Sequence, residues 1–153
     1  MSIFLNPQRH YCGSLREEHI GQRVTVCGWC ARMRDLGGLI FIDLRDREGI
    51  VQCVFDEADN KELFDLAFTV RSEYTLKIEG VVRQRSSIND KIPTGRIEIL
   101  ADSLEIYEKA DTPPFEISDE ATVNDALRLK YRYLDLRRPS LQKSLALRHK
   151  IAH

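Results

Sequence analysis

An aromatic ring, an amide and a carboxylate stand at three positions where strand-like segments turn side chains away from the core. They are Phe41, Gln52 and Glu98. A planar ring can stack on an unstacked nucleobase, an amide can donate to and accept from a base edge, and a carboxylate accepts from an amino group. Because a carboxylate repels phosphate, Glu98 fits such a surface only as a reader of bases. Together the three types indicate a face that recognises single-stranded nucleic acid.

The segments that carry these residues alternate as β-strands do. In residues 39–45 three aliphatic side chains share one face and leave Phe41 on the other, because successive side chains of a strand point to opposite faces. The same rule places Gln52 and Glu98 opposite their apolar neighbours. The outward set predicted in this way comprises Arg32, Arg34, Phe41, Gln52, Arg83, Arg85 and Glu98.

Periodicity predicts five strands and a helix. The strands are expected at about 23–34, 39–45, 50–55, 74–83 and 96–107, with a helix at 60–70 that Asn60 could cap. Gly28 suggests a bulge or a sharp bend in the first strand. Ser14 and Glu17 fit a capping box and predict a short helix that ends near Gly21.

This order defines the expected fold class. It is all-β with one or two short helices: an OB-fold, which is a five-stranded Greek-key barrel, with a helix between strands 3 and 4. A plain β-sandwich would have a similar strand count but would not need that helix. A hinge and a C-terminal helix are expected to follow the barrel.

Composition divides the chain further. Between Glu105 and Asp125 there are seven acidic residues and one basic residue, around Pro113-Pro114. From Arg128 to His153 eight Lys and Arg residues face one Asp. We therefore expect a barrel domain at 1–107, a hinge at 108–130, and at 131–153 the start of a further domain that continues beyond this chain.

Several function classes find no support. The net charge is −1, so a nucleic-acid site must be a local patch. No apolar run could span a membrane, and no secretion signal is present, which makes a cytoplasmic location the expectation. Cys27 and Cys30 form a CxxC, but strand positions three apart point to opposite faces and no second pair completes a zinc site. We expect no metal site and no catalytic residue in this chain.

Three segments together resemble the bacterial aspartyl-tRNA synthetases, a class II family. They are Cys27-Gly-Trp29, the stretch Arg34–Gly49 that contains Asp35-Leu-Gly-Gly38, and Leu129-Lys-Tyr-Arg-Tyr-Leu-Asp-Leu-Arg-Arg-Pro139. The resemblance covers nearly the whole chain from Tyr11 onward. The related lysyl and asparaginyl enzymes share the OB-fold and parts of the first two segments.

The resemblance implies an anticodon-binding domain followed by a hinge and the start of a catalytic domain. Phe41 would stack on the middle anticodon base, a uridine, which Gln52 and Arg34 would help to read. Glu98 would read the first base. The third base or the backbone would be contacted by Arg83, Arg85 and Asn89. Leu36 stands where family members that charge both aspartate and asparagine tRNAs often carry His, and so resembles the discriminating kind.

The resemblance also implies an activity outside this chain. The full-length protein would join aspartate to tRNA with ATP and Mg2+ as a homodimer, whereas the present chain would need no cofactor and would bind tRNA, not DNA. Three alternatives stay open: the same domain of an asparaginyl or lysyl enzyme, a sequence-tolerant single-strand binder on the same fold, and an interaction domain that binds no nucleic acid.

Overall fold

The computed structural model describes residues 9–152. The chain divides into two compact units, Met1–Thr112 and Pro113–His153. The strands are β1 Arg9–His10, β2 Arg23–Asp35, β3 Leu39–Arg45, β4 Ile50–Asp56, β5 Thr75–Gln84 and β6 Ile97–Glu108. The helices are α1 Lys61–Phe68, α2 Asp125–Lys130, α3 Arg132–Asp135 and α4 Pro139–Ala152, together with two 3-10 helices, η2 Cys12–Ser14 and η3 Glu17–His19.

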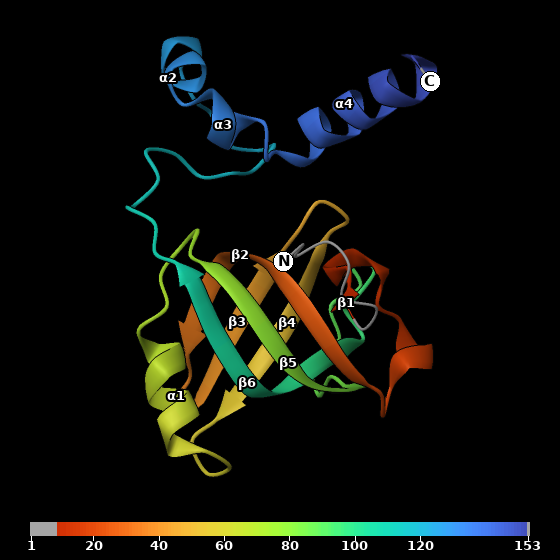
Figure 1. Cartoon of the computed structure of the whole chain (residues 1–153), viewed down its shortest axis with the longest axis vertical. Coiled ribbons are helices and arrows are strands. Elements are labelled where there is room, and N and C mark those ends of the chain that lie inside the picture. Colours follow the sequence, from red (N-terminus) through yellow and green to blue (C-terminus); the bar gives the residue numbers. More distant parts are fainter. Residues whose placement is uncertain (1–8, 153) are drawn as a thin grey trace. The chain divides into compact units, whose positions relative to one another are not determined.

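The first unit is a closed barrel with α1 at one end (Figure 1). Its sheet runs β1-β2-β3-β4-β6-β5, and a further pairing between β2 and β5 closes it. The pairs are antiparallel except for β1–β2 and β4–β6, and the β4–β6 pair is short, with Cys53 opposite Ile99 and Val54 opposite Leu100. Five barrel strands with α1 between β4 and β5 confirm the predicted fold.

Alternation of side chains builds the core inside the barrel. Val26, Ile42, Cys53, Ile78 and Ile99, one from each barrel strand, are fully buried. The helix α1 begins where predicted, because the Asn60 side chain accepts a hydrogen bond from the Leu63 N–H at 3.0 Å. Three of the four cysteines lie in the core as small apolar side chains, while Cys27 is half-buried on the opposite face of β2.

Strand β2 carries a bulge that decides which side chains reach the surface. Its register with β3 shifts between Cys30 and Arg32. Before the shift the even-numbered residues face inward; after it Met33 packs on the core and Arg34 lies opposite Phe41. The bulge falls a few residues beyond Gly28, where one was predicted. Gly28 instead permits a close approach, since a Cβ there would lie 2.3 Å from the Arg45 carbonyl oxygen.

The segment before β2 differs from the prediction. Ser14 does not cap a helix at 14–21; its hydroxyl donates to the Tyr11 carbonyl, and two separate 3-10 helices form instead. In η3 the Arg16 N–H donates to Nδ1 of His19 at 3.1 Å, which supplies the reciprocal contact that Glu17 was expected to make. The capping-box pattern therefore marked a turn-forming segment but not the residues that make the turn.

The second unit is helical. Asn124 caps α2 by accepting from the Ala126 N–H at 2.8 Å, so a helix occupies the end of the segment 108–130. Asp135 is fully buried and accepts from Arg128 and Arg132 at 3.0 and 2.8 Å. Helix α4 exposes three aliphatic side chains, those of Leu145, Leu147 and Ile151. None of the helices in residues 9–152 has the length and apolarity needed to cross a membrane.

Candidate nucleic-acid interface

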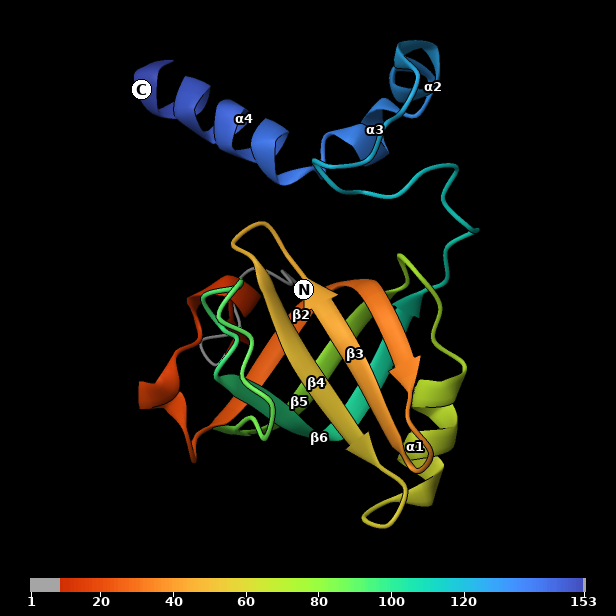
Figure 2. The same ribbon diagram turned by 180° about the vertical axis from the view of Figure 1, so that it is seen from behind.

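The outer face of the barrel carries a chain of hydrogen bonds that takes one side chain from each barrel strand, in the order of the sheet. Its members are Arg34 on β2, Asp43 on β3, Gln52 on β4, Glu98 on β6 and Arg83 on β5. The strands β3 and β4 lie at the front of this face in the view from behind (Figure 2). Closure of the barrel thus assembles residues that are up to 64 positions apart in the sequence.

Each link in this chain has hydrogen-bond geometry. Arg34 Nη2 donates to Asp43 Oδ1 at 2.9 Å and to Gln52 Oε1 at 3.1 Å. Gln52 Nε2 donates to Glu98 Oε2 at 2.8 Å, and Arg83 Nε donates to Glu98 Oε1 at 2.8 Å. Charge-assisted bonds of this kind are among the stronger ones, so the side chains are held in place before any ligand arrives.

Burial within the chain of bonds is uneven. Gln52 and Glu98 are each only 4% exposed, whereas the side chain of Arg83 is 44% exposed. Nε of Arg34 is buried and has no hydrogen-bond partner among the described residues. A buried donor without a partner is costly, so this atom is suited to meet an acceptor on a ligand.

Phe41 provides an aromatic surface beside these polar groups. It lies on β3 opposite Arg34 and Val54, and the Arg34 guanidinium carbon is 5.7 Å from the ring centroid. The ring is half-buried, as expected of an aromatic side chain on the outer face of a sheet. A ring next to fixed donors and acceptors is the arrangement in which OB-fold proteins stack and read unpaired bases.

Two connecting segments border the face. Leu36, 66% exposed, lies in the tight turn between β2 and β3, where its N–H donates to the Leu39 carbonyl at 2.9 Å. Residues 85–96 connect β5 and β6, and the Thr94 hydroxyl donates to the Ile50 carbonyl, which holds this segment beside β4 (Figure 2). Asn89 shapes it, because its side chain accepts from the Lys91 N–H at 3.1 Å.

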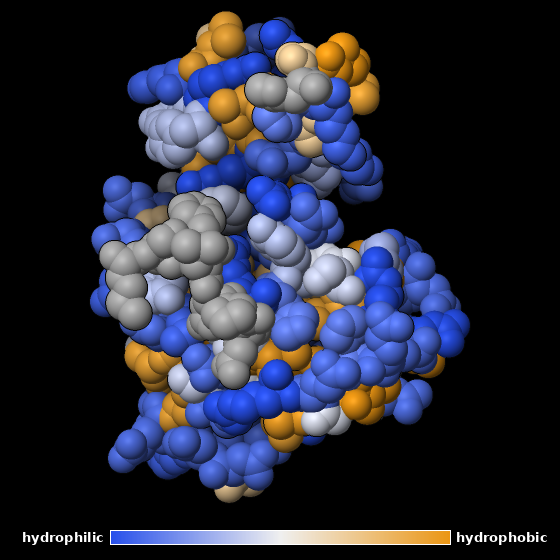
Figure 3. All heavy atoms as spheres, turned by 45° about the vertical axis from the view of Figure 1, so that its right-hand side comes forward, coloured by the Kyte–Doolittle hydropathy of each residue, from blue (hydrophilic) through white to orange (hydrophobic). Residues whose placement is uncertain are grey.

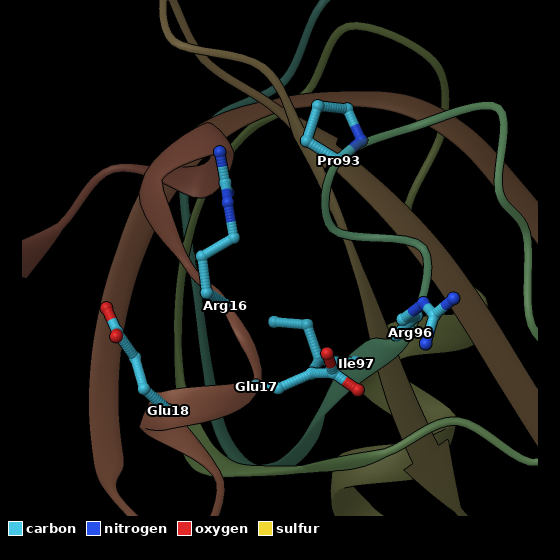
Figure 4. A pocket seen from close by; sticks show the side chains of 6 residues that line it. All are labelled: Arg16, Glu17, Glu18, Pro93, Arg96 and Ile97. Carbon is cyan, nitrogen blue, oxygen red and sulfur yellow. The ribbon is translucent and has the colours of Figure 1, made fainter.

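Near the second segment the surface is hollowed into a cleft of about 260 Å³. Arg16 and Arg96 lie on opposite sides of the opening, with Ile97 at its base (Figure 4). None of the residues that were predicted to bind nucleic acid lines this cleft. The face of the molecule shown in Figure 3 is mostly hydrophilic, with apolar residues between the hydrophilic ones.

The structure therefore brings together most of the predicted side chains. Arg34, Phe41, Gln52, Glu98 and Arg83 lie on one face, and Arg85 follows at the end of β5 without an ion pair among the described residues. Asp43 was not selected from the sequence, although its outward position on β3 beside Phe41 was a usable signal. Arg32 is exposed on the same side of β2 but belongs to none of these bonds.

Comparison with known proteins identifies the family to which the barrel belongs. A family model described as "OB-fold nucleic acid binding domain", for tRNA anticodons, matches residues 24–107, which is more than half of the chain. The chain belongs to this OB-fold anticodon-binding family. The match begins at the second residue of β2 and ends at the penultimate residue of β6, so it coincides with the closed barrel.

Relatives of this OB-fold domain are synthetases. The aspartate–tRNA ligase of Clostridium tetani is 53% identical over 92% of this chain, and the aspartate–tRNA(Asp/Asn) ligase of a Thermoanaerobacter species is 56% identical over 93%. The chain spans 24% of the length of either protein. The asparaginyl-tRNA synthetase of Pyrococcus horikoshii has a similar structure, with a TM-score of 0.71 and 29% identity over 85% of this chain and 30% of its own.

Proposed function

We propose that the outer face of the barrel binds the anticodon loop of a tRNA for aspartate, as part of an aspartate–tRNA ligase. The observation that carries the proposal is the hydrogen-bonded chain from Arg34 to Arg83 beside the ring of Phe41. It offers fixed donors and acceptors next to a stacking surface, which suits bases that are already unpaired in a loop.

Each side chain has a part in this proposal. Phe41 stacks on the middle base, and Gln52 with Arg34 reads its edge. Glu98 lies where the first base would approach. The third base and the RNA backbone are contacted by residues in and around the β5–β6 connection, which are Arg83, Arg85 and Asn89. Leu36, exposed at the turn, would favour aspartate tRNA over asparagine tRNA.

The activity of the whole protein belongs to the same proposal. A synthetase of this family would use ATP and Mg2+ in the cytoplasm as a homodimer. Within residues 9–152 the His, Cys, Asp and Glu side chains form no group of three or more that could hold a metal ion. In this proposal the part of the present chain is to select the tRNA.

Titration of the chain with short RNA hairpins tests the proposal. A hairpin with the loop anticodon GUC should bind at least about tenfold more tightly than one with a scrambled loop, since each well-placed base contact contributes about 1–3 kcal/mol. A DNA hairpin of the same sequence should bind more weakly. Equal affinity for the GUC and scrambled hairpins would instead indicate a sequence-tolerant single-strand binder, and no binding of either would leave an interaction domain.

A further inference from the structure

The amide of Gln52 can adopt only one orientation in this structure. Its Nε2 donates to Glu98 Oε2 at 2.8 Å, while its Oε1 accepts from Arg34 Nη2 at 3.1 Å. A carboxylate only accepts hydrogen bonds and a guanidinium only donates them. Reversing the amide would set oxygen against oxygen and N–H against N–H, so the two charged neighbours fix which end of the amide is which.

The fixed amide leaves a defined pair of groups for a ligand. Nε2 of Gln52, the amide atom next to Glu98, still has one N–H that makes no bond to Glu98. Oε1, the amide atom next to Arg34, still has one lone pair that accepts nothing from Arg34. Uracil presents a carbonyl acceptor next to a ring N–H donor. Cytosine presents an amino donor next to a ring-nitrogen acceptor, which is the reverse order. For a base held in one pose, a fixed amide can make both bonds with only one of the two pyrimidines.

An unrestrained amide would not discriminate in this way. A glutamine in water rotates about its last bond and can offer donor and acceptor in either order, so it would match either pyrimidine. Gln52 and Glu98 are both 4% exposed, which leaves little room for water to replace the bond between them. Arg83 holds the other oxygen of Glu98 at 2.8 Å and so keeps the carboxylate in place.

We propose that Glu98 is a positioning residue that gives this face its preference for uracil over cytosine at the base stacked on Phe41. It acts through Gln52, whose amide it orients. The inference rests on the proposed function, because it assumes that a base lies against Phe41. It adds to that function the group responsible for distinguishing a keto from an amino pyrimidine.

Two RNA hairpins that differ only in the middle anticodon base, GUC and GCC, test the inference. The chain with its native sequence should prefer GUC by at least about tenfold, the order expected for one two-point base contact. In Glu98→Gln the new amide can donate or accept, so Gln52 is released and the preference should fall to about threefold or less. Affinity for GUC itself is expected to fall as well, since Glu98 also lies where the first base would approach, so the ratio of the GUC and GCC affinities is the measurement that tests the inference. Glu105→Gln, the same charge change farther along β6, is the control and should keep the preference.

Other results would overturn the inference. An unchanged preference in Glu98→Gln, with weaker binding of both hairpins, would mean that Glu98 contacts RNA without orienting Gln52. Equal affinity of the native chain for GUC and GCC would remove the discrimination while leaving anticodon-loop binding intact. If neither hairpin bound better than a scrambled one, the proposed function itself would fail.

A measurement without RNA tests the orientation of Gln52 directly, and so separates failure of this inference from failure of the proposed function. In the native chain, one of the two Nε2 protons of Gln52 should exchange slowly with water and show a distinct NMR shift, because it bonds to a buried carboxylate. Glu98→Gln should remove this protection, and a thermal melt would establish that the variant is folded. Rapid exchange of both Gln52 protons in the native chain would overturn the inference whatever the RNA data show.

Discussion

Arg45 and Glu73 form a buried ion pair in which Nη2 of the arginine lies 2.8 Å from one carboxylate oxygen and 2.9 Å from the other. The two side chains are only 9% and 4% exposed. Arg45 ends β3, and Glu73 precedes β5 with a φ of 64°, a backbone region that few residues other than glycine adopt. The ion pair therefore holds the turn at Glu73, whose backbone conformation is unfavourable, against the end of β3.

Removing one partner of this pair should destabilise the barrel strongly. We expect Glu73→Ala to lower the free energy of unfolding by about 3–5 kcal/mol, because it leaves the Arg45 charge buried and unpaired. The double variant Arg45→Met/Glu73→Leu should recover most of that loss. Urea denaturation measures both. A loss below about 1 kcal/mol in the single variant would show that water reaches Arg45.

Phe41→Ala should weaken RNA binding without unfolding the barrel. The ring lies on the outer face, so its loss removes stacking and not core packing, and we expect about 1–3 kcal/mol less binding energy for the GUC hairpin. Phe68→Ala is a matched control, because Phe68 is 49% exposed on α1. Fluorescence titration at fixed salt would detect the difference, and equal losses in the two variants would contradict a stacking role for Phe41.

The salt dependence of binding should report on Arg85. If its guanidinium neutralises one phosphate, Arg85→Gln should make the slope of log K against log salt shallower by about 0.7, the value for a single-stranded backbone. Lys61→Gln should not change the slope, since Lys61 lies on α1 and pairs with Glu57 at 2.8 Å. Titrations between about 50 and 200 mM salt would show this. An unchanged slope in Arg85→Gln would place that residue outside the RNA path.

Stability should fall in alkaline solution because of the buried thiols. Burial raises the pKa of Cys30 to about 12 and raises the pKa values of Cys12 and Cys53 well above the ordinary value. A thiol whose pKa is raised on folding binds its proton more tightly in the folded state, so its contribution is complete below the unfolded pKa and is lost as the pH rises. We expect the urea midpoint to decrease above about pH 9. A constant midpoint up to pH 10.5 would contradict this.

The helical unit should lose stability at the opposite end of the pH range. Burial alone would raise the pKa of Asp135, but the hydrogen bond and charge of Arg128, with those of Arg138 and Arg132, hold it below its usual value. A lowered carboxyl pKa contributes stability that is lost as the pH falls through the folded value. The NMR shifts of α2 and α3 should therefore move toward coil values below about pH 4, and Asp135→Asn should show that change already at neutral pH.

Alternation and turn signals were sufficient to predict the barrel strands and the inward or outward direction of Phe41, Gln52 and Glu98. These features depend on neighbours within a few residues, which a sequence displays directly. The cap of α1 by Asn60 is local in the same sense. The segment before β2 was predicted wrongly because a Ser and a Glu at capping-box spacing did not reveal that Arg16 and His19 would make the contacts.

The parts that could not be predicted depend on partners that are distant in sequence. Arg34 was expected on the outer face, and it lies there, but strict alternation from Val24 would point it into the core. The part that the sequence did not reveal is the place of the bulge, between Cys30 and Arg32, which brings Arg34 outward. The bond between Gln52 and Glu98 joins residues 46 positions apart and exists only because β4 and β6 pair. Arg45 shares the parity of Phe41, yet it is buried, because Glu73 arrives from another segment to neutralise it.

The short parallel pairing between β4 and β6 has a consequence for accuracy. Only two residue pairs join these strands, next to the point where Gln52 reaches Glu98. If β4 and β6 separate there, the Gln52 amide loses its hydrogen bond to the Glu98 carboxylate and can rotate into the opposite orientation. Separation of β4 from β6 and misreading of the base would then be one event. The frequency with which these two strands separate would therefore set the error rate of base recognition. A bound base that contacts residues on both strands would hold β4 and β6 together, and would thereby keep the Gln52 amide in the orientation that recognises that base.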